Sequence, residues 1–440
     1  MTKCYQNSQL VFSFARCQRR RVEASFSGGH VTSDGGVLLL RQADRKLGLL
    51  REVSQALEDP RRKKSCAHAL LTMLRQRVFG LCLGYEDLND HHALRHDLAL
   101  QTGVDRAGAL ASAPTLCRLE NRADRAAAWA VNRALVEQFI ASHKRPPKEI
   151  VLDFDATDDR VHGLQEGRFF HGYYDHYCFL PLYVFCGEQL LVAYLRPSNI
   201  DPAQHAGALL KLLVRRLRQA WPQTRIVFRA DSGFCRHWIL GWCERNNIGY
   251  AVGMARNPRL LALAAPLMET AAEAFAQEQR KQRLFASLRY AAHTWKRQRR
   301  VIVKAEHTSK GPNPRFVVTN LPQSSQHVYD TIYCARGEME NRIKEQQLDL
   351  FADRTSCHRW WANQWRLLLS ALAYTLMEAI RRLALQGTEL ARAQCGTLRL
   401  KLLKIGAVIV RNTRRIRVLL SSAYPYQTLF LHAAAKLNTS

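Results

Sequence analysis

The sequence predicts a mixed α/β fold in which a helix-rich region precedes a sheet-containing core. Residues 34–143 carry apolar side chains at helical spacing and lack strand alternation. From residue 149 onward, three adjacent strand-like runs are followed by a helix, a strand, a helix and a strand. This order of elements is typical of a sheet covered by helices. The paired prolines of HKRPPKE forbid helix between the two parts, and we place a boundary near Pro146.

The helix-rich part begins after the turn glycines of DGGVLLLRQADRKLGLL, residues 34–50. Further helices are expected in CAHALLTMLRQRVFGLCLG and in AAAWAVNRALVEQFIASH. Between them, SAPTLCRLENR places a capping Ser112 before a proline in the first turn, and Arg118 and Arg122 lie one turn apart. This segment is similar to the start of the recognition helix in a helix-turn-helix unit, and an ordinary capped helix is the alternative.

The core begins with EIVLDFD, which predicts a buried strand that ends in carboxylates. The runs YCFLPLYVFCG and EQLLVAYLRPS predict a hairpin beside it, followed by the helix PAQHAGALLKLLVRRLRQAW. A strand in RIVFRAD, a helix in CRHWILGWCERNN and a strand in GYAVGMA complete this part of the sheet. After residue 256 the alternation lapses into a basic, partly β segment, and WWANQWRLLLSALAYTLMEAIRRLAL then predicts a buried closing helix.

These patterns divide the chain into five regions. We expect a helix-rich N-terminal DNA-binding region over 1–146 and the first part of the core over 147–256. A basic β-rich insertion over 257–328 precedes the catalytic helix and the end of the core over 329–385. The last region, 386–440, is expected to bind DNA or assist assembly, because residues 381–440 hold eleven Lys and Arg against one Glu.

Charge identifies the kind of partner. The chain has 65 Lys and Arg against 37 Asp and Glu, a formal charge of +28 that favours a polyanion such as nucleic acid. No uncharged apolar run is long enough to span a membrane, and the N-terminus lacks the order of a secretory signal. The twelve cysteines include no C-x-x-C pair, so we expect small core residues in a reducing cytoplasm rather than metal ligands.

Three carboxylates stand where elements of the core could converge. Asp155 ends the first core strand, Asp231 ends the strand in RADSGF, and Glu340 lies in YCARGEMENRIKE. Asp153 points to the same face as Asp155, so either could be the ligand. Clustered carboxylates repel one another unless a cation holds them, and oxygen ligands favour Mg²⁺ first and Mn²⁺ next. Taken singly, a strand-end Asp can be a turn cap and Glu340 can pair with Lys344.

The same helix segment places Tyr333, Arg336, Glu340 and Lys344 on one face, at spacings of three, four and four residues. Such a face is either a solvated ladder of ion pairs or one wall of a reaction site. Two ions about 4 Å apart would serve in-line displacement at a phosphodiester, which would also explain the basic charge.

In this order, DFDATDD, RADSGF and YCARGEMENRIKE resemble the DDE transposases of bacterial insertion sequences. The likeness is to the cut-and-paste group that has a Tyr, Arg, Glu, Lys signature around the last carboxylate. SDGGVLLLRQAD, PTLCRLEN and RRIRVLLSSAYP extend it over nearly the whole chain. One position departs from the signature, because Gln347 stands seven residues after Glu340 and Lys344 is the nearest lysine.

The resemblance implies a ribonuclease H-like core in which Asp155, Asp231 and Glu340 hold two Mg²⁺ ions, with Mn²⁺ able to substitute. It implies phosphate contacts for Tyr333 and Arg336. The sequence adds Lys344 on the same helix, Arg118 and Arg122 near the N-terminus, and Arg414 and Arg415 in the basic C-terminal section as expected DNA contacts.

The expected function is binding of the terminal inverted repeats of a mobile element, followed by strand cleavage and transfer into target DNA. Pairing two DNA ends implies a homodimer in the synaptic complex, and the expected location is the bacterial cytoplasm at the nucleoid. Two alternatives stay open: a ribonuclease H-type nuclease or resolvase, and a non-cleaving DNA-binding regulator.

Overall fold

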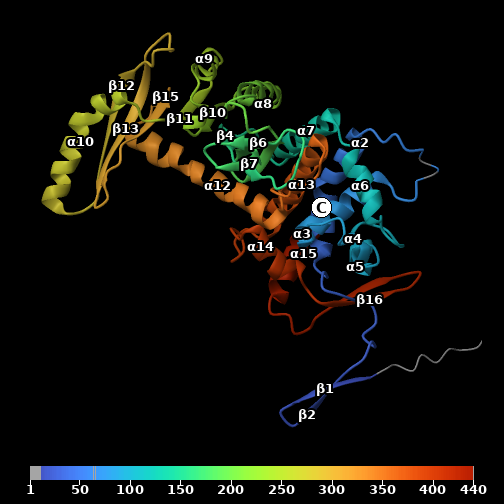
Figure 1. The fold of residues 1–440 in the computed structure, drawn as a ribbon. Coiled ribbons are helices and arrows are strands. Elements are labelled where there is room, and N and C mark those ends of the chain that lie inside the picture. The colour runs from blue at the N-terminus through green and yellow to red at the C-terminus, as the bar shows by residue number, and fades with distance from the viewer. Residues whose placement is uncertain (1–10, 63, 65, 440) are drawn as a thin grey trace, which may run out of the picture. The chain divides into compact units, whose positions relative to one another are not determined.

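The computed structural model describes residues 11–439 except 63 and 65, and its chain divides into two compact units (Figure 1). The first unit comprises the described parts of 1–54, 59–119 and 379–440. The second comprises 55–58 and 120–378. The mixed α/β class expected from the sequence is confirmed, because the second unit contains a large mixed sheet with helices packed on it.

The first unit is mainly helical. Its helices are α1 (Val37–Leu47), α2 (Leu49–Ala56), α3 (Leu70–Leu83), α4 (His91–Leu94), α5 (Leu98–Gly103), α6 (Ala113–Asn121), α14 (Cys395–Leu398) and α15 (Gln427–Asn438), and the last residues of α2 and α6 pass into the second unit. Helix α3 is buried along most of its length, from Met73 to Leu83. It therefore lies inside this unit, with Arg75, Gln76 and Arg77 buried along with its apolar residues.

In the first unit, a strand from the N-terminal part of the described chain pairs with one from its C-terminal part. Strand β3 (Val31–Thr32) pairs with β16 (Ala407–Arg411), which pairs in turn with β17 (Ile416–Leu420). The glycines of the DGG turn allow this close approach, because a Cβ added at Gly36 would lie 2.0 Å from the carbonyl oxygen of Leu402. The basic C-terminal section thus contains the antiparallel hairpin β16–β17.

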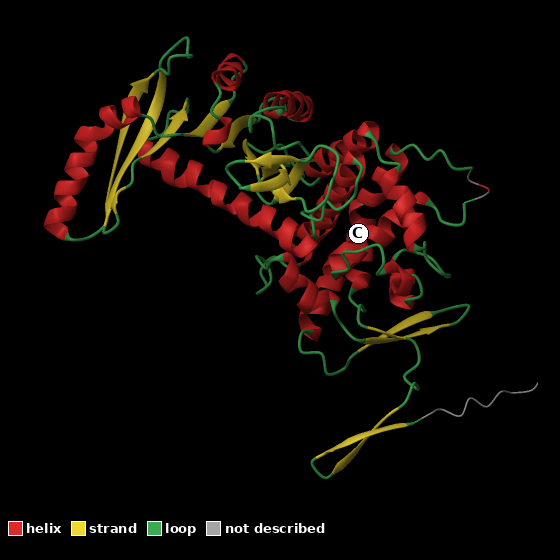
Figure 2. Cartoon of the chain, viewed as in Figure 1, coloured by secondary structure: helices red, strands yellow, loops and turns green. Residues whose placement is uncertain are grey.

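The first unit also contains a separate hairpin. It is formed by β1 (Phe12–Cys17) and β2 (Arg20–Ala24), which pair only with each other among the described strands (Figure 2). All residues of both strands are exposed.

The second unit is built on a nine-stranded sheet in the order β12-β13-β15-β11-β10-β4-β8-β9, with β14 paired to β13. Strands β4 (Glu149–Ala156), β10 (Arg225–Ala230) and β11 (Gly249–Met254) run parallel. The next strand, β8 (Leu182–Cys186), is antiparallel to β4, and the edge strand β9 (Gln189–Tyr194) is antiparallel to β8. The carboxyl ends of β4 and β10 therefore lie side by side, which brings Asp155 and Asp231 to one edge of the sheet.

Each face of the sheet has its own cover. On one face, alternate residues such as Leu152 and Phe228 pack in a core with residues of α7 (Arg125–Ala141), α8 (Ala206–Ala220), α9 (His237–Arg245) and α10 (Pro258–Glu278). On the other face, Val227 and Ala251 pack against Val328 and Tyr329. The long helix α13 (Trp360–Ala384) contacts this second face, where the Tyr374 ring lies 5.7 Å from that of Phe185.

The segment between β11 and the signature helix extends the sheet. It contains α10 and the strands β12 (Gln282–Tyr290), β13 (Arg299–Thr308), β14 (Gly311–Pro312) and β15 (Arg315–Thr319). β15 pairs with β11, so the insertion continues the core sheet, and α10 packs on its strands (Figure 2). Part of this segment was expected to be β from RRVIVKAEH and RFVVTNL, which form β13 and β15, whereas β12 was missed because its half-exposed residues give a weak apolar alternation.

One strand prediction was wrong. The run YCFLPLYVFCG is not one strand of the core, because it breaks at Leu180 and Pro181 into β7 (His176–Phe179) and β8. Proline cannot donate a ladder hydrogen bond, so the chain changes partners there. β7 instead pairs with β5 (Asp159–Arg160) and β6 (Phe169–His171) in a small separate sheet. The first of these strands, β5, begins four residues after Asp155.

Candidate active site

The first carboxylate lies at the end of the central strand. In β4, residues 150, 152 and 154 face the helix-covered core, so Asp153 and Asp155 point to the opposite face, as strand alternation predicted. Asp155 is 8% exposed. Its Oδ1 accepts a hydrogen bond from the backbone N–H of Ala156 at 3.0 Å. Its other oxygen is directed to the helix segment that contains Arg336.

The second carboxylate follows the adjacent parallel strand. Asp231 comes directly after β10 and accepts from the backbone N–H of Gly233 at 2.8 Å, which fixes the short turn of Ser232–Phe234. The neighbouring strand leaves room for the signature tyrosine, because a Cβ added at Gly253 would lie 2.6 Å from the Tyr333 hydroxyl. Gly253 thus lets Tyr333 approach Asp231 closely. Burial raises the pKa of Tyr333, and the Asp231 carboxylate adds to the rise.

The third carboxylate lies on a helix that is irregular at both ends. Residues 328–333 form a wide π-type turn, 334–336 a tight turn, Gly337–Lys344 the α-helix α12, and 345–349 a second wide turn. Tyr333 and Arg336 therefore precede the regular helix in which the spacing argument placed them. Arg336 nevertheless reaches Glu340 at i+4, with Nη2 donating to Glu340 Oε1 at 2.5 Å.

Arg336 joins the carboxylates. Its Nη1 donates to Asp155 Oδ2 at 3.0 Å while Nη2 holds Glu340, so one guanidinium links the end of β4 to α12. Asp231 and Tyr333 also act on Arg336 electrostatically and raise its pKa together with Asp155 and Glu340. The structure thus gathers Asp155, Asp231, Glu340 and two signature residues around one positive charge.

The electrostatics of this cluster are unfavourable to the acidic groups. The pKa of Asp155 is raised to about 7, mainly by burial; Arg336 opposes this rise, and the Asp231 and Glu340 carboxylates add to it. Burial likewise raises the pKa of Asp231, with Arg336 opposing and Glu340 adding to the rise. Arg336 alone therefore does not compensate three carboxylates, and the site would gain from additional positive charge.

The donor chemistry fits a hard divalent cation, since the convergent groups are all carboxylates and one of them is half exposed. Yet in the part of the chain that the structure describes, no group of three or more His, Cys, Asp or Glu is close enough to hold a metal ion. The guanidinium of Arg336 lies between Asp155 and Glu340 instead. Closing the carboxylates on an ion would require this guanidinium to move aside.

Asp153 is engaged elsewhere. It faces Arg229 directly across the β4–β10 ladder, and Arg229 donates to both carboxylate oxygens of Asp153. Arg229 also donates to the Ile332 carbonyl at 2.5 Å, which ties the entry of the signature helix to the sheet. The register of two parallel strands decides this pairing, and the sequence does not reveal that register.

Gln347, at the position that departs from the signature, contacts a second buried acid. Its amide donates to the Asp158 carbonyl and to Asp159 Oδ1, both at 3.0 Å. Asp159 is fully buried, and burial raises its pKa to about 8, with Gln347 opposing. This contact joins the helix end to the chain four residues after Asp155, a link that sequence reasoning missed although DATDD contains the residue.

The other expected DNA-contact residues lie outside this cluster. Lys344 is exposed one turn beyond Glu340. Arg118 on α6 is exposed and donates to Thr115 Oγ1 at 3.1 Å, and Arg122 is exposed just after that helix. Arg414 and Arg415 are exposed in the turn between β16 and β17. Their accessibility suits contact with phosphates, and their role stays a prediction.

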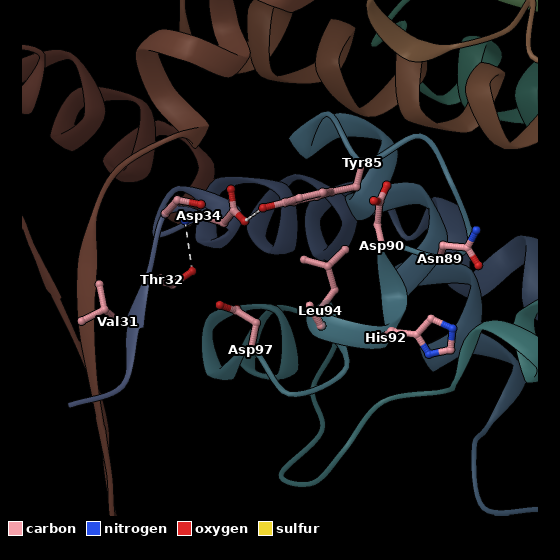
Figure 3. Close-up of a pocket in the computed structure, with 11 residues that line it drawn as sticks. Val31, Thr32, Asp34, Tyr85, Asn89, Asp90, His92, Leu94 and Asp97 are labelled. Carbon is pink, nitrogen blue, oxygen red and sulfur yellow. Dashed lines mark hydrogen bonds between the residues drawn. The ribbon is translucent and has the colours of Figure 1, made fainter. Parts of the chain in front are cut away.

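A pocket in the first unit has a different character (Figure 3). Its acidic lining residues are already engaged: the Tyr85 hydroxyl donates to Asp34 at 2.6 Å and Lys404 to the same carboxylate at 2.7 Å. Asp97 caps α5 by accepting from Leu100 N at 2.7 Å. We assign these acids to holding the unit together, because each satisfies a specific partner.

Comparison with known protein families shows the family to which the chain belongs. The family described as "Transposase DDE domain group 1" matches residues 14–440, and the chain belongs to this family. It is thus a transposase by family, as the resemblance of its motifs indicated. No characterised protein sequence matches the chain.

Among solved structures, the chain is similar to one in the cryo-EM structure of a piggyBac transposase synaptic complex with hairpin DNA. The identity is 8% and the TM-score 0.45, over 84% of this chain and 79% of that one. Separately, none of the helices in the described residues has the length and apolar character needed to cross a bilayer.

Proposed function

We propose that this transposase cleaves and joins DNA at a centre formed by Asp155, Asp231 and Glu340. The observation that supports it most is the convergence of these carboxylates, from two parallel strand ends and a distant helix, on the Arg336 guanidinium. The strand order β9-β8-β4-β10-β11, antiparallel on one side and parallel on the other, agrees with a ribonuclease H-like core.

Asp155, Asp231 and Glu340 would hold the divalent ions, with Mg²⁺ the preferred metal and Mn²⁺ a substitute. When bound, two such ions would supply Lewis-acid activation of the attacking oxygen and stabilisation of the leaving oxygen. Asp153 stays paired with Arg229 and supports the strand, rather than serving as a ligand. A buried pair of this kind is costly to break, since removing one partner leaves the other charge uncompensated.

The overall reaction has two displacements at phosphorus. In the first, water attacks the phosphodiester at the element end and the 3′-oxygen leaves, taking up a proton to give a 3′-hydroxyl. In the second, that hydroxyl attacks a phosphodiester of the target, and a new 3′-oxygen leaves and takes up the proton that the attacking hydroxyl loses. Arg336 exchanges its carboxylate partners for the reacting phosphate, where its charge offsets the negative charge that develops on the oxygens.

We propose further DNA contacts beyond the carboxylates. Tyr333 in the cluster and the exposed Lys344 beyond it would contact phosphates next to the cleaved end. Arg118 and Arg122 in the helical N-terminal region, and Arg414 and Arg415 in the C-terminal hairpin, would bind the terminal inverted repeats. Since two element ends must be paired, we propose that two copies act together in the complex with DNA.

The test compares Glu340→Gln with Glu338→Gln in a plasmid assay that contains the element with its own flanking DNA. Glu338 lies on the same helix with 72% of its side chain exposed, so it is a matched control. We expect Glu340→Gln to lower Mg²⁺-dependent cleavage roughly 100-fold or more, since it removes a charge from the metal centre. The control should cleave normally. Equal cleavage by both variants would refute the assigned site.

The joined products of the same assay distinguish the remaining alternatives. A transposase leaves the element end covalently attached to target DNA, whereas a ribonuclease H-type nuclease leaves cleaved ends only. A non-cleaving regulator leaves the plasmid intact while still binding it.

A further inference from the structure

The hairpin β1–β2 has no structural role that the described chain accounts for. Its register pairs Phe12 with Ala24 and Phe14 with Val22, and it is paired with no other strand of the described residues. Residues 11–30 are exposed throughout. Because an isolated two-stranded hairpin is marginally stable in water, this ribbon would be stabilised by a binding partner.

The tip of the hairpin is strongly basic. The four arginines lie within six residues around the turn at Gln18, whose φ is 56°: Arg16, Arg19, Arg20 and Arg21. None of them has an ion-pair partner among the described residues, and Glu23 is the single acid between residues 11 and 24. Four unpaired like charges at one end repel one another and attract a polyanion.

One face of the hairpin is apolar. Phe12, Phe14 and Val22 share it and are 44%, 62% and 37% exposed, and the ring of Phe26 lies 6.0 Å from that of Phe12. An apolar face next to a basic tip could meet protein or DNA. A second copy of this chain would bring the same +28 charge to the contact, so without DNA to offset that charge self-association is opposed electrostatically.

We propose that β1–β2 is a DNA-binding ribbon that enters the major groove of the duplex bound by this transposase. The major groove is wide enough for a two-stranded β-ribbon, and its floor presents thymine methyl groups to apolar side chains. The arginines at the tip bind phosphates at the edges of the groove, where they fix the orientation of the DNA without specifying its sequence. The proposal rests on the proposed function and adds a binding element that is separate from the carboxylate centre.

The test compares Arg19→Ala/Arg20→Ala/Arg21→Ala with Lys144→Ala/Arg145→Ala/Lys148→Ala. The control removes the same charge from exposed residues that precede β4, at the end of the strand opposite to Asp155. Binding is measured by fluorescence anisotropy with a labelled 40-base-pair mixed-sequence duplex, in metal-free buffer at 50 to 200 mM salt. Circular dichroism checks that both variants are folded.

We expect the hairpin variant to reduce the slope of log affinity against log salt by about 2 to 3, because each lost phosphate contact removes roughly 0.9. The control should keep the wild-type slope. An unchanged slope in the hairpin variant would overturn the proposal, and so would an equal reduction in both variants. If sedimentation shows that the hairpin variant loses self-association while its slope is unchanged, the ribbon contacts protein instead. A flat salt response of the wild-type protein would contradict the proposed function itself.

Discussion

Single residues at the centre differ sharply in what they contribute. Asp155 and Glu340 share the guanidinium of Arg336, whereas Asp153, two residues from Asp155, is held by Arg229. From the sequence, Asp153 and Asp155 were both candidates for the first metal ligand, because both side chains point to one face of the strand. The sequence could not decide between them, since the partner of each depends on the register between β4 and β10 and on the approach of the signature helix.

Asp159 gives a prediction on pH dependence. Its folded-state pKa of about 8 lies far above the usual value of an unfolded aspartate, so between pH 4 and 8 the folded protein holds a proton that the unfolded chain has lost. The group therefore lowers stability by about 1.4 kcal/mol for each pH unit over this range. We expect Asp159→Asn to remove this loss and to raise Tm increasingly from pH 5 to 8. Parallel Tm profiles of the variant and the wild type would contradict the buried, protonated state.

At the scale of elements, the signature helix is positioned from several sides. Tyr329 packs in a core with Val227 and Ala251, Arg229 holds the Ile332 carbonyl, and Arg342 donates to Glu188 at 2.6 Å. Gln347 adds the contact to Asp159 near the other end. The sequence predicted that this helix contributes a carboxylate, but these anchors depend on residues far away in the sequence and leave no local pattern.

Gln347 is predicted to position Glu340. Seven residues correspond to about two helical turns. The contact at Gln347 therefore fixes the position and the rotation of the helix, and with them the direction of Glu340 toward Asp155. We expect Gln347→Leu to lower the rate of cleavage about 10- to 100-fold, because small displacements of reacting groups are costly. DNA affinity should be unchanged.

Two further variants control this experiment. Leu348→Gln changes the adjacent residue, which is 73% exposed, and should behave as wild type. Gln347→Lys introduces the signature residue and can still donate to Asp159, so it should recover much of the activity. A normal rate in Gln347→Leu, or equal losses in all three variants, would rule out the positioning role.

At the scale of the whole molecule, the fold class, the order of core elements and the basic insertion could be predicted because each depends on local periodicity and composition. The attachment of β15 to β11, which makes the insertion continue the core sheet, could not. Nor could the pairing of β3 with β16, in which Thr32 lies opposite Ala407. Long-range pairing of this kind is decided by register and packing rather than by local sequence.

The net charge of +28 predicts how the whole protein responds to salt. If six to ten phosphates are contacted, affinity for duplex DNA should fall about 10³- to 10⁵-fold between 50 and 200 mM salt. Anisotropy titrations of the wild-type protein at several salt concentrations measure this directly. A loss of DNA affinity of less than tenfold would indicate that contacts between basic residues and phosphates contribute little to binding.

The central claim is that Asp155, Asp231 and Glu340 together hold divalent ions beside bound DNA. Its most direct test is the Mn²⁺ stoichiometry of the DNA complex, measured by electron paramagnetic resonance for the wild type, Asp155→Asn, Asp231→Asn, Glu340→Gln and the control Glu338→Gln. The account predicts ions bound by the wild type and the control, and a loss of bound Mn²⁺ in each of the other three. Retention of the wild-type stoichiometry in all three would contradict it.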